Sequence, residues 1–104
     1  MRVVVKFHES ARADYEAWKA RLSKEPMGNP GIARLHAEEL IAQFETHGGR
    51  PPGAVLRHEL DPPSWIWRFA SDTTIRFVRR EQRKGIWGGL FVEVLIIGVK
   101  HHRS

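Results

Sequence analysis

Two arginines in the second half of the chain are the residues best suited to chemistry. Arg68 and Arg76 lie inside two β-rich aromatic runs of residues 64–81, SWIWRFASDTTIRFVRRE. If the runs pair as a hairpin with Trp67 facing Phe77, Arg68 lies directly opposite Arg76 on one face. The other face then collects the apolar side chains Trp65, Trp67, Phe69, Ile75 and Phe77. A guanidinium group grips phosphate oxygens with two parallel hydrogen bonds, so the pair predicts a phosphate-binding sheet face.

The same arginine pair has a second interpretation. Like charges directly opposite each other destabilise a sheet by roughly a few tenths of a kcal/mol or more. Each arginine could therefore meet a carboxylate, with Glu59, Glu81 and Glu93 as the partners. It could also extend its charged end into water. The sequence leaves both interpretations open.

Further basic residues surround the predicted hairpin and give the chain a formal net charge of +5. They are Arg79, Arg80, Arg83, Lys84, Lys100, His101, His102 and Arg103. Excess positive charge favours polyanions, because phosphate contacts release counterions, and it equally suits an acidic protein partner. Trp87 lies among glycines in RKGIWGG, where it could stack on a base, anchor a partner or fold back onto the sheet.

Two helices are expected ahead of the hairpin. Residues 11–24 carry an apolar stripe at helical spacing, and Ser10 can cap this helix. Asn29 and Pro30 predict the cap and first residue of a second helix, which runs to about Thr46. Gly48 is the predicted stop. The stripes consist of Ala11, Tyr15, Trp18 and Leu22 in the first helix and of Ala33, Ala37, Leu40, Ile41 and Phe44 in the second.

Strands are expected at both ends of the chain. RVVVKF, residues 2–7, predicts the first, and SWIWRF, TIRFVRRE and FVEVLIIGVK predict three more, with AVLRHEL as a further short strand. The order β-α-α-β-β-β predicts one α+β domain over residues 1–104. In it, two helices pack on one face of an antiparallel sheet.

Several classes of protein and site are not expected. The chain has no cysteine, which rules out disulfides and thiolate metal sites and suits a reducing cytoplasm. The apolar run at the N-terminus is too short for a signal peptide, and LFVEVLIIGV is interrupted by Glu93 and too short to span a membrane. The histidines His8, His36, His47 and His58 lack the spacing of metal ligands, so no metal or cofactor is expected.

The order of elements and the arginine pair resemble the RelE/ParE superfamily of bacterial toxins over nearly the whole chain. WIWRF is similar to the family's second strand, and TIRFVRRE to its third, where an aliphatic or aromatic residue precedes an arginine and two apolar residues. VEVLIIGVKHH is similar to the last strand, with its glycine and basic end. The resemblance implies a RelE-like fold and the toxin of a type II toxin–antitoxin pair.

Carried over residue by residue, the resemblance makes Arg68, Arg76 and His102, or alternatively His101, the catalytic residues. Metal-free RNA cleavage needs a base for the 2′-OH, charge stabilisation at the phosphate and an acid for the leaving oxygen. Arginines supply the second, and a histidine can supply the first or third. The histidine pair could equally be a basic tail. The residues implied in RNA binding are Arg80, Arg83, Lys84, Trp87, Lys100 and Arg103.

One family feature has no counterpart in this sequence. RelE itself also uses a tyrosine a few residues beyond the last strand, whereas the single tyrosine here is Tyr15. Some RelE-like enzymes use histidine and glutamate instead, which makes His101, His102 and Glu59 the substitutes.

Three functions follow from the resemblance. The first is an endoribonuclease that blocks translation by cutting mRNA, on the ribosome or free. The second is a ParE-like toxin that binds DNA gyrase and cuts no RNA. The third is a RelE-fold module without toxicity. For a toxin, we expect an acidic antitoxin as partner and a cytoplasmic location.

Overall fold

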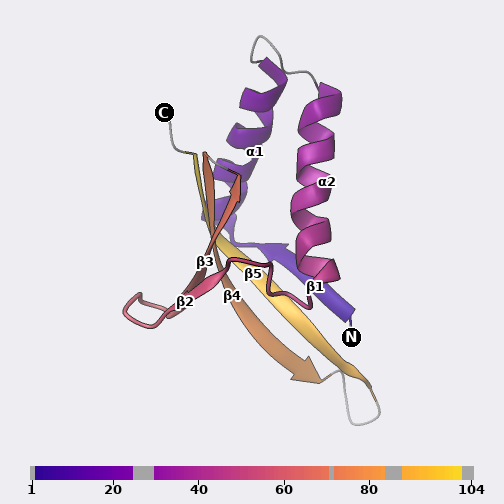
Figure 1. Ribbon diagram of the computed structural model, residues 1–104, viewed down its shortest axis with the longest axis vertical. Helices are drawn as coiled ribbons and strands as arrows, with labels where there is room; N and C mark the ends of the chain where they lie inside the picture. The colour runs from indigo at the N-terminus through magenta and orange to yellow at the C-terminus, as the bar shows by residue number, and fades with distance from the viewer. Residues whose placement is uncertain (1, 25–29, 71, 84–87, 102–104) are drawn as a thin grey trace.

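The computed structural model describes residues 2–24, 30–70, 72–83 and 88–101, without the side chain of Pro30. In these residues the chain forms two helices and a five-stranded sheet, which confirms the α+β class (Figure 1). The elements are β1 (Arg2–Phe7), α1 (Glu9–Lys24), α2 (Pro30–Thr46), β2 (Val55–Arg57), β3 (Ser64–Ala70), β4 (Thr73–Arg83) and β5 (Leu90–His101).

Local hydrogen bonds explain where the helices begin and end. α1 starts at Glu9, so the predicted cap Ser10 lies inside the helix, and His8 takes the capping place. The Nδ1 atom of His8 accepts a bond from the backbone N–H of Ser10, and its carbonyl accepts from Arg12. At the end of α2, Gly48 adopts a φ of 62°, which confirms the predicted stop. The predicted cap Asn29 lies outside the described residues.

The strand order is β1-β5-β4-β3-β2. The four strands from β2 to β5 pair antiparallel, as expected, whereas β1 pairs parallel with β5 and makes the sheet mixed. A parallel pair needs a crossover rather than a hairpin. The chain between β1 and β5, including both helices, supplies that crossover. β5 is therefore a central strand, with partners on both sides.

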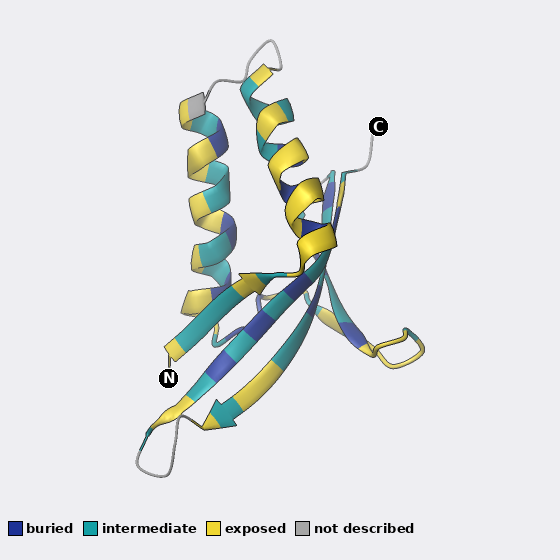
Figure 2. Cartoon of the chain, turned by 180° about the vertical axis from the view of Figure 1, so that it is seen from behind, coloured by how far each residue is buried: buried dark blue, intermediate teal, exposed yellow. Residues whose placement is uncertain are grey.

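Both helices pack on one face of the sheet, and Figure 2 shows buried positions alternating with less buried ones along the strands. The predicted apolar face is correct: Trp67, Ile75 and Phe77 are buried, and Trp65 and Phe69 pack against them. Phe44 of α2 contacts both Trp67 and Phe77 edge to face, at 5.2 and 4.9 Å between ring centroids. We call the other side of the sheet the helix-free face.

The predicted register of the hairpin is wrong by two residues. Phe77 lies opposite Trp65 instead of Trp67, and Arg76 lies opposite Ile66 instead of Arg68. β4 begins at Thr73, inside the segment expected as loop, and a bulge follows Arg68, so the hairpin closes more tightly. A two-residue slip keeps every side chain on its face, which is why burial alone could not detect it.

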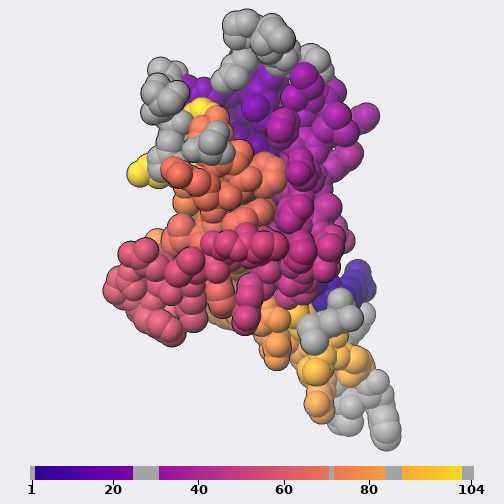
Figure 3. Space-filling view, viewed as in Figure 1, coloured from indigo at the N-terminus to yellow at the C-terminus, as the bar shows by residue number. Residues whose placement is uncertain are grey.

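The ends of β4 and β5 form a ribbon that extends beyond the rest of the sheet. β3 pairs with β4 only as far as Phe77, while β4 continues along β5 to Arg83. This ribbon projects from the lower right of the molecule in Figures 1 and 3. The sheet therefore has a wide body and a narrow arm, with β1 alongside β5.

Candidate nucleic-acid interface

Three basic side chains meet on the helix-free face where β3, β4 and β5 lie side by side. Arg68 pairs with Thr74, and Thr74 pairs with Lys100, so Arg68 and Lys100 flank one residue of β4. Two strand spacings place their Cα atoms about 10 Å apart. Arg76 lies on the same face, two residues along β4 from Thr74. We call Arg68, Arg76 and Lys100 the basic cluster.

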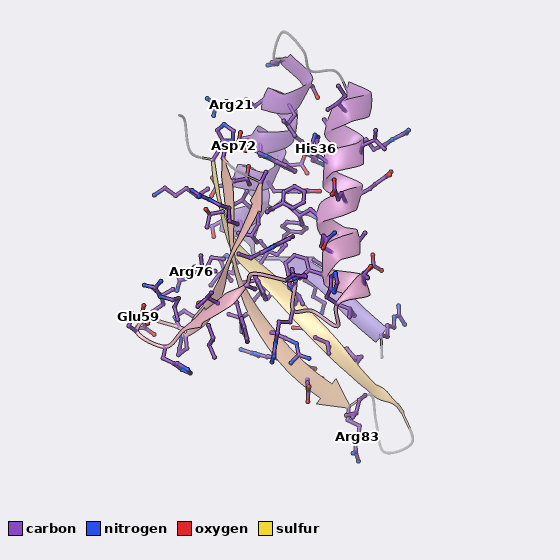
Figure 4. The ribbon with its side chains drawn as sticks, in the orientation of Figure 1. Arg21, His36, Glu59, Asp72, Arg76 and Arg83 are labelled. Atoms are coloured by element: carbon purple, nitrogen blue, oxygen red, sulfur yellow. The ribbon has the colours of Figure 1, made fainter. Side chains whose placement is uncertain are left out.

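The side chain of Arg76 is held in place by the segment before β3. Its Nε donates to Ser64 Oγ at 3.0 Å, and its NH2 donates to the Pro62 carbonyl at 3.1 Å. Ser64 Oγ itself donates to the same carbonyl at 2.6 Å. Opposite Arg76, Gly98 has no side chain that could cover the guanidinium. Neutral oxygens thus orient the guanidinium of Arg76, a residue labelled in Figure 4.

The carboxylate partners considered for the arginines are engaged elsewhere. Glu59 binds Arg57, Glu81 binds Arg79 at 3.3 Å, and Glu93 binds Lys6 at 3.3 Å. Within the described parts of the chain, no carboxylate lies within ion-pair distance of the basic cluster. Its positive charge is therefore not neutralised internally and is available to an anion.

Glu59 is a poor substitute for a catalytic base. It lies exposed in the loop between β2 and β3, and the hydrogen bond from Arg57 lowers the pKa of its carboxyl group. A lower pKa makes a weaker base. Its ion pair further ties it to β2, at the edge of the sheet.

The structure does not bring His101 to the arginines. His101 pairs with the buried Thr73, so its side chain lies on the helix-covered side, whereas the neighbouring Lys100 points to the helix-free face. There it lines a cavity of about 170 Å³ with Trp18 and Arg21 of α1. Its Nε2 lies 3.8 Å from Asp72 Oδ2, and its buried Nδ1 has no hydrogen-bond partner in the described chain.

The other predicted contact residues are distributed along the ribbon. Arg80 is exposed on the helix-free face opposite Glu93, and Arg83 lies near the far end of β4 (Figure 4). Of the remaining predicted site residues, Lys84, Trp87, His102 and Arg103 lie outside the described residues.

Tyr15 cannot replace the family tyrosine. It is buried in α1, where it stacks on Phe7 at 4.4 Å and on Trp18 at 5.7 Å between ring centroids. Burial, with a smaller contribution from Glu16, raises the pKa of its hydroxyl. It belongs to the core and lies on the helix-covered side of the sheet.

Comparison with known proteins rests on structure alone. No family model matches the sequence, and no curated protein matches it. A solved structure of a YoeB/ParE toxin from Agrobacterium tumefaciens matches 99% of this chain and 100% of its own. The TM-score is 0.56 and the sequence identity is 17%. The chain has a RelE/ParE-type toxin fold.

Strand pairing brings Lys100, and not His101, to the face that carries Arg68 and Arg76. Lys100 was predicted to bind RNA from the end of the last strand, but its position beside Arg68 was not foreseen. A sequence pattern could have predicted the face on which Lys100 lies. Lys100 follows Gly98 by two residues, the spacing that keeps side chains on one face of a strand. The Ser64 and Pro62 contacts to Arg76 had no sequence signal, since they join residues 12 and 14 positions apart.

Neither a metal site nor a membrane-spanning helix is found in the part of the chain that is described. No group of histidine, aspartate and glutamate side chains there could hold a metal ion. Neither of its helices is long and apolar enough to cross a membrane.

Proposed function

We propose that the protein is the toxin of a bacterial type II toxin–antitoxin pair and acts as a metal-independent, RelE-like endoribonuclease on mRNA. The observation that carries this proposal is the basic cluster on the helix-free face, where three cations have no carboxylate partner among the described residues. The likeness to a solved YoeB/ParE toxin supports a toxin of this general kind.

The basic cluster suits the charge that develops during RNA cleavage. The 2′-oxygen attacks the adjacent phosphorus, and the bond to the 5′-oxygen of the next nucleotide breaks. The products are a 2′,3′-cyclic phosphate and a free 5′-hydroxyl. Arg76, held by Ser64 and Pro62, offers its guanidinium to the phosphate oxygens at little reorganisation cost, and Arg68 adds a second cation.

Proton transfer needs two further groups. We assign the donation of a proton to the leaving 5′-oxygen to Lys100, which lies on the same face as the two arginines. His102 follows His101 in the sequence and lies outside the described residues, and we assign it the removal of the 2′-OH proton. His101 is not given this role, because its ring lies on the opposite side of the sheet from the basic cluster.

The proposed function implies its partners and location. An acidic antitoxin would neutralise the helix-free face by charge complementarity and so block access to RNA. The substrate is mRNA, on the ribosome or free, in the cytoplasm. No cofactor takes part in the proposed reaction.

A ParE-like toxin that binds DNA gyrase is the alternative, and the placement of His101 favours it. With His101 turned away, the described strand residues of the helix-free face include no histidine that could act as a general base. A basic face without a base would bind a partner but would not cut RNA. A non-toxic module of the same fold is the third possibility.

Induction of the chain in cells separates the three functions. Incorporation of labelled amino acids and of labelled thymidine should be followed while growth falls. Early loss of protein synthesis supports the endoribonuclease, early arrest of replication supports the gyrase-directed toxin, and no growth effect supports the non-toxic module. Cleavage of a synthetic mRNA by the purified chain in EDTA, with and without ribosomes, then tests metal independence directly.

A further inference from the structure

A groove of about 520 Å³ opens on the helix-free face at the far end of the sheet from the basic cluster. Two rows of side chains across β1, β5 and β4 form it. The first row is Arg2, Phe91 and Gln82, and the second is Val4 and Glu93, with Arg80 opposite Glu93 at the edge of the groove. Lys6, Gly89 and Leu90 complete the lining. We call this feature the Phe91 groove.

The Phe91 groove and the basic cluster belong to one continuous surface. On β5, Phe91 and Lys100 are nine residues apart, which corresponds to roughly 30 Å at the rise of a strand. Between them the helix-free face carries Leu95 and Val78, and Arg80 lies at the edge of the groove. An extended polyanion bound at one end of this face would therefore pass the other.

The groove combines an apolar floor with a cationic rim. Val4 and Phe91 are half-buried and Leu90 is exposed, so their side chains offer apolar surface to a ligand. Arg2, Lys6 and Arg80 are exposed around this floor. Single-stranded nucleic acids are bound by this combination, because bases stack on aromatic side chains while cations hold the phosphates.

Glu93 is the carboxylate among the residues that line the groove. Among the described strand residues on the helix-free face it is the single carboxylate, and its side chain is only 19% exposed. Lys6 binds one of its oxygens, Oε2, and the other, Oε1, has no bond to the described chain. A carboxylate repels phosphate but accepts hydrogen bonds from the amino group of a base.

We propose that the Phe91 groove binds a base of single-stranded RNA and prefers a base with an exocyclic amino group. The base stacks on Phe91, Glu93 Oε1 accepts from the amino group of cytosine, adenine or guanine, and Arg2 and Lys6 hold the flanking phosphates. Uracil fits poorly because two carbonyl oxygens flank its N3–H and would face the carboxylate. The inference rests on RNA as the substrate of the proposed function and adds a second contact that selects its sequence.

A nucleotide satisfies the groove better than a protein segment does. An acidic peptide would match the rim, but its carboxylates would meet Glu93. A second copy of this chain would place another basic rim against Arg2, Lys6 and Arg80. A nucleotide brings a flat apolar ring, an amino donor and a negative phosphate to the three parts of the groove that suit them.

Binding is measured with fluorescein-labelled octamers of 2′-O-methyl cytidine, adenosine and uridine. These probes cannot be cleaved, because the attacking 2′-OH is blocked. Anisotropy measured with the full chain therefore reports binding without cleavage. The cytidine and adenosine octamers should bind about tenfold more tightly than the uridine octamer. Phe91→Ala should weaken the cytidine complex about tenfold, the loss typical of one stacked base, and this factor should persist in higher salt.

Matched substitutions on α2 serve as controls. Glu93→Gln should reduce the preference for cytidine over uridine to less than about threefold, whereas Glu38→Gln, in the exposed ion pair with Arg34, should leave it unchanged. Leu35→Ala removes an exposed apolar side chain far from the groove and is the control for Phe91→Ala. Far-ultraviolet circular dichroism checks that each variant is folded.

Three results would overturn the inference. One is equal affinity for all three octamers, and another is an unchanged cytidine affinity in Phe91→Ala. The third is a dimer in sedimentation experiments that Phe91→Ala dissociates, because the groove would then be an interface between copies. Failure of the proposed function is seen separately: a chain that neither cuts mRNA nor stops protein synthesis can still show the base preference.

Discussion

Arg76 and Arg79 lie three residues apart in β4 and work on opposite faces of the sheet. Arg79 is on the helix-covered face, where its Nε donates to the Gly48 carbonyl at 3.0 Å and its NH2 meets Glu81. Arg76 is on the helix-free face and, within the described residues, donates to the neutral oxygens of Ser64 and Pro62 and to no carboxylate. Arg79 is hydrogen-bonded to the chain just after α2. Arg76 forms no ion pair with a carboxylate of the described residues.

The same contrast separates the two faces as a whole. The helix-covered face buries aromatic and aliphatic side chains in the core. The helix-free face carries cations from β1, β3, β4 and β5, and neither α1 nor α2, the two helices of the described residues, covers it. Substitutions on the first face should therefore change mainly stability. Substitutions on the second should change mainly activity and binding, and Arg76, which is held by Ser64 and Pro62, should affect stability as well.

The largest effect is expected in the core. Trp67 is 5% exposed and contacts Phe44 of α2, so Trp67→Ala should lower the free energy of unfolding by about 3–5 kcal/mol. A domain of this size has little more stability than that to lose. Urea denaturation followed by circular dichroism measures the change, with Leu35→Ala as the exposed control. A loss below about 1 kcal/mol would show that Trp67 does not hold α2 to the sheet.

Within the basic cluster, Arg68 and Arg76 should differ. Either substitution by alanine should lower RNA cleavage by about 100-fold or more, the effect of losing one oriented donor to the transition state. Arg76→Ala should also cost about 1–2 kcal/mol of stability, because two hydrogen bonds to Ser64 and Pro62 are lost. Arg68→Ala should leave stability unchanged, because Arg68 is exposed. Normal cleavage by a folded Arg76→Ala variant would mean that this arginine is structural only.

The two adjacent histidines are expected to differ in their effect on cleavage. His102→Gln should reduce cleavage by about 100-fold if it is the general base. His101→Gln should leave cleavage within about twofold of the parent chain, because its ring lies under α1, near Asp72. Single-turnover cleavage of a synthetic RNA is the measurement. The opposite ranking would require His101 to reach the helix-free face.

The smallest effects should come from the neighbouring arginines of the ribbon. Arg79→Ala removes the bond to Gly48 and should cost about 1 kcal/mol in unfolding. Arg80→Ala should leave stability unchanged. It should reduce the slope of log RNA affinity against log salt concentration by about one, as expected for the loss of one phosphate contact. Unfolding curves and anisotropy titrations at several salt concentrations check both. Equal effects of the two substitutions on stability would remove the distinction between the faces in the ribbon.

Sequence alone determined which residues face the core. The two-residue alternation in residues 64–81 assigns Trp67, Ile75 and Phe77 to one face and Arg68 and Arg76 to the other. Helical spacing likewise assigns Trp18 and Phe44 to the core. These assignments are local, because side-chain direction follows from the geometry of a single helix or strand.

The tertiary structure decided which residues from different strands and helices become neighbours. Register and strand order place Lys100 next to Arg68, put His101 beneath α1 and give Arg76 the oxygens of Ser64 and Pro62. A two-residue slip leaves every alternation intact, so periodicity carries no information about register. The register was decided by the tight closure of the β3–β4 hairpin, the bulges and the pairing of β5 between β1 and β4. These features depend on contacts between residues far apart in the chain.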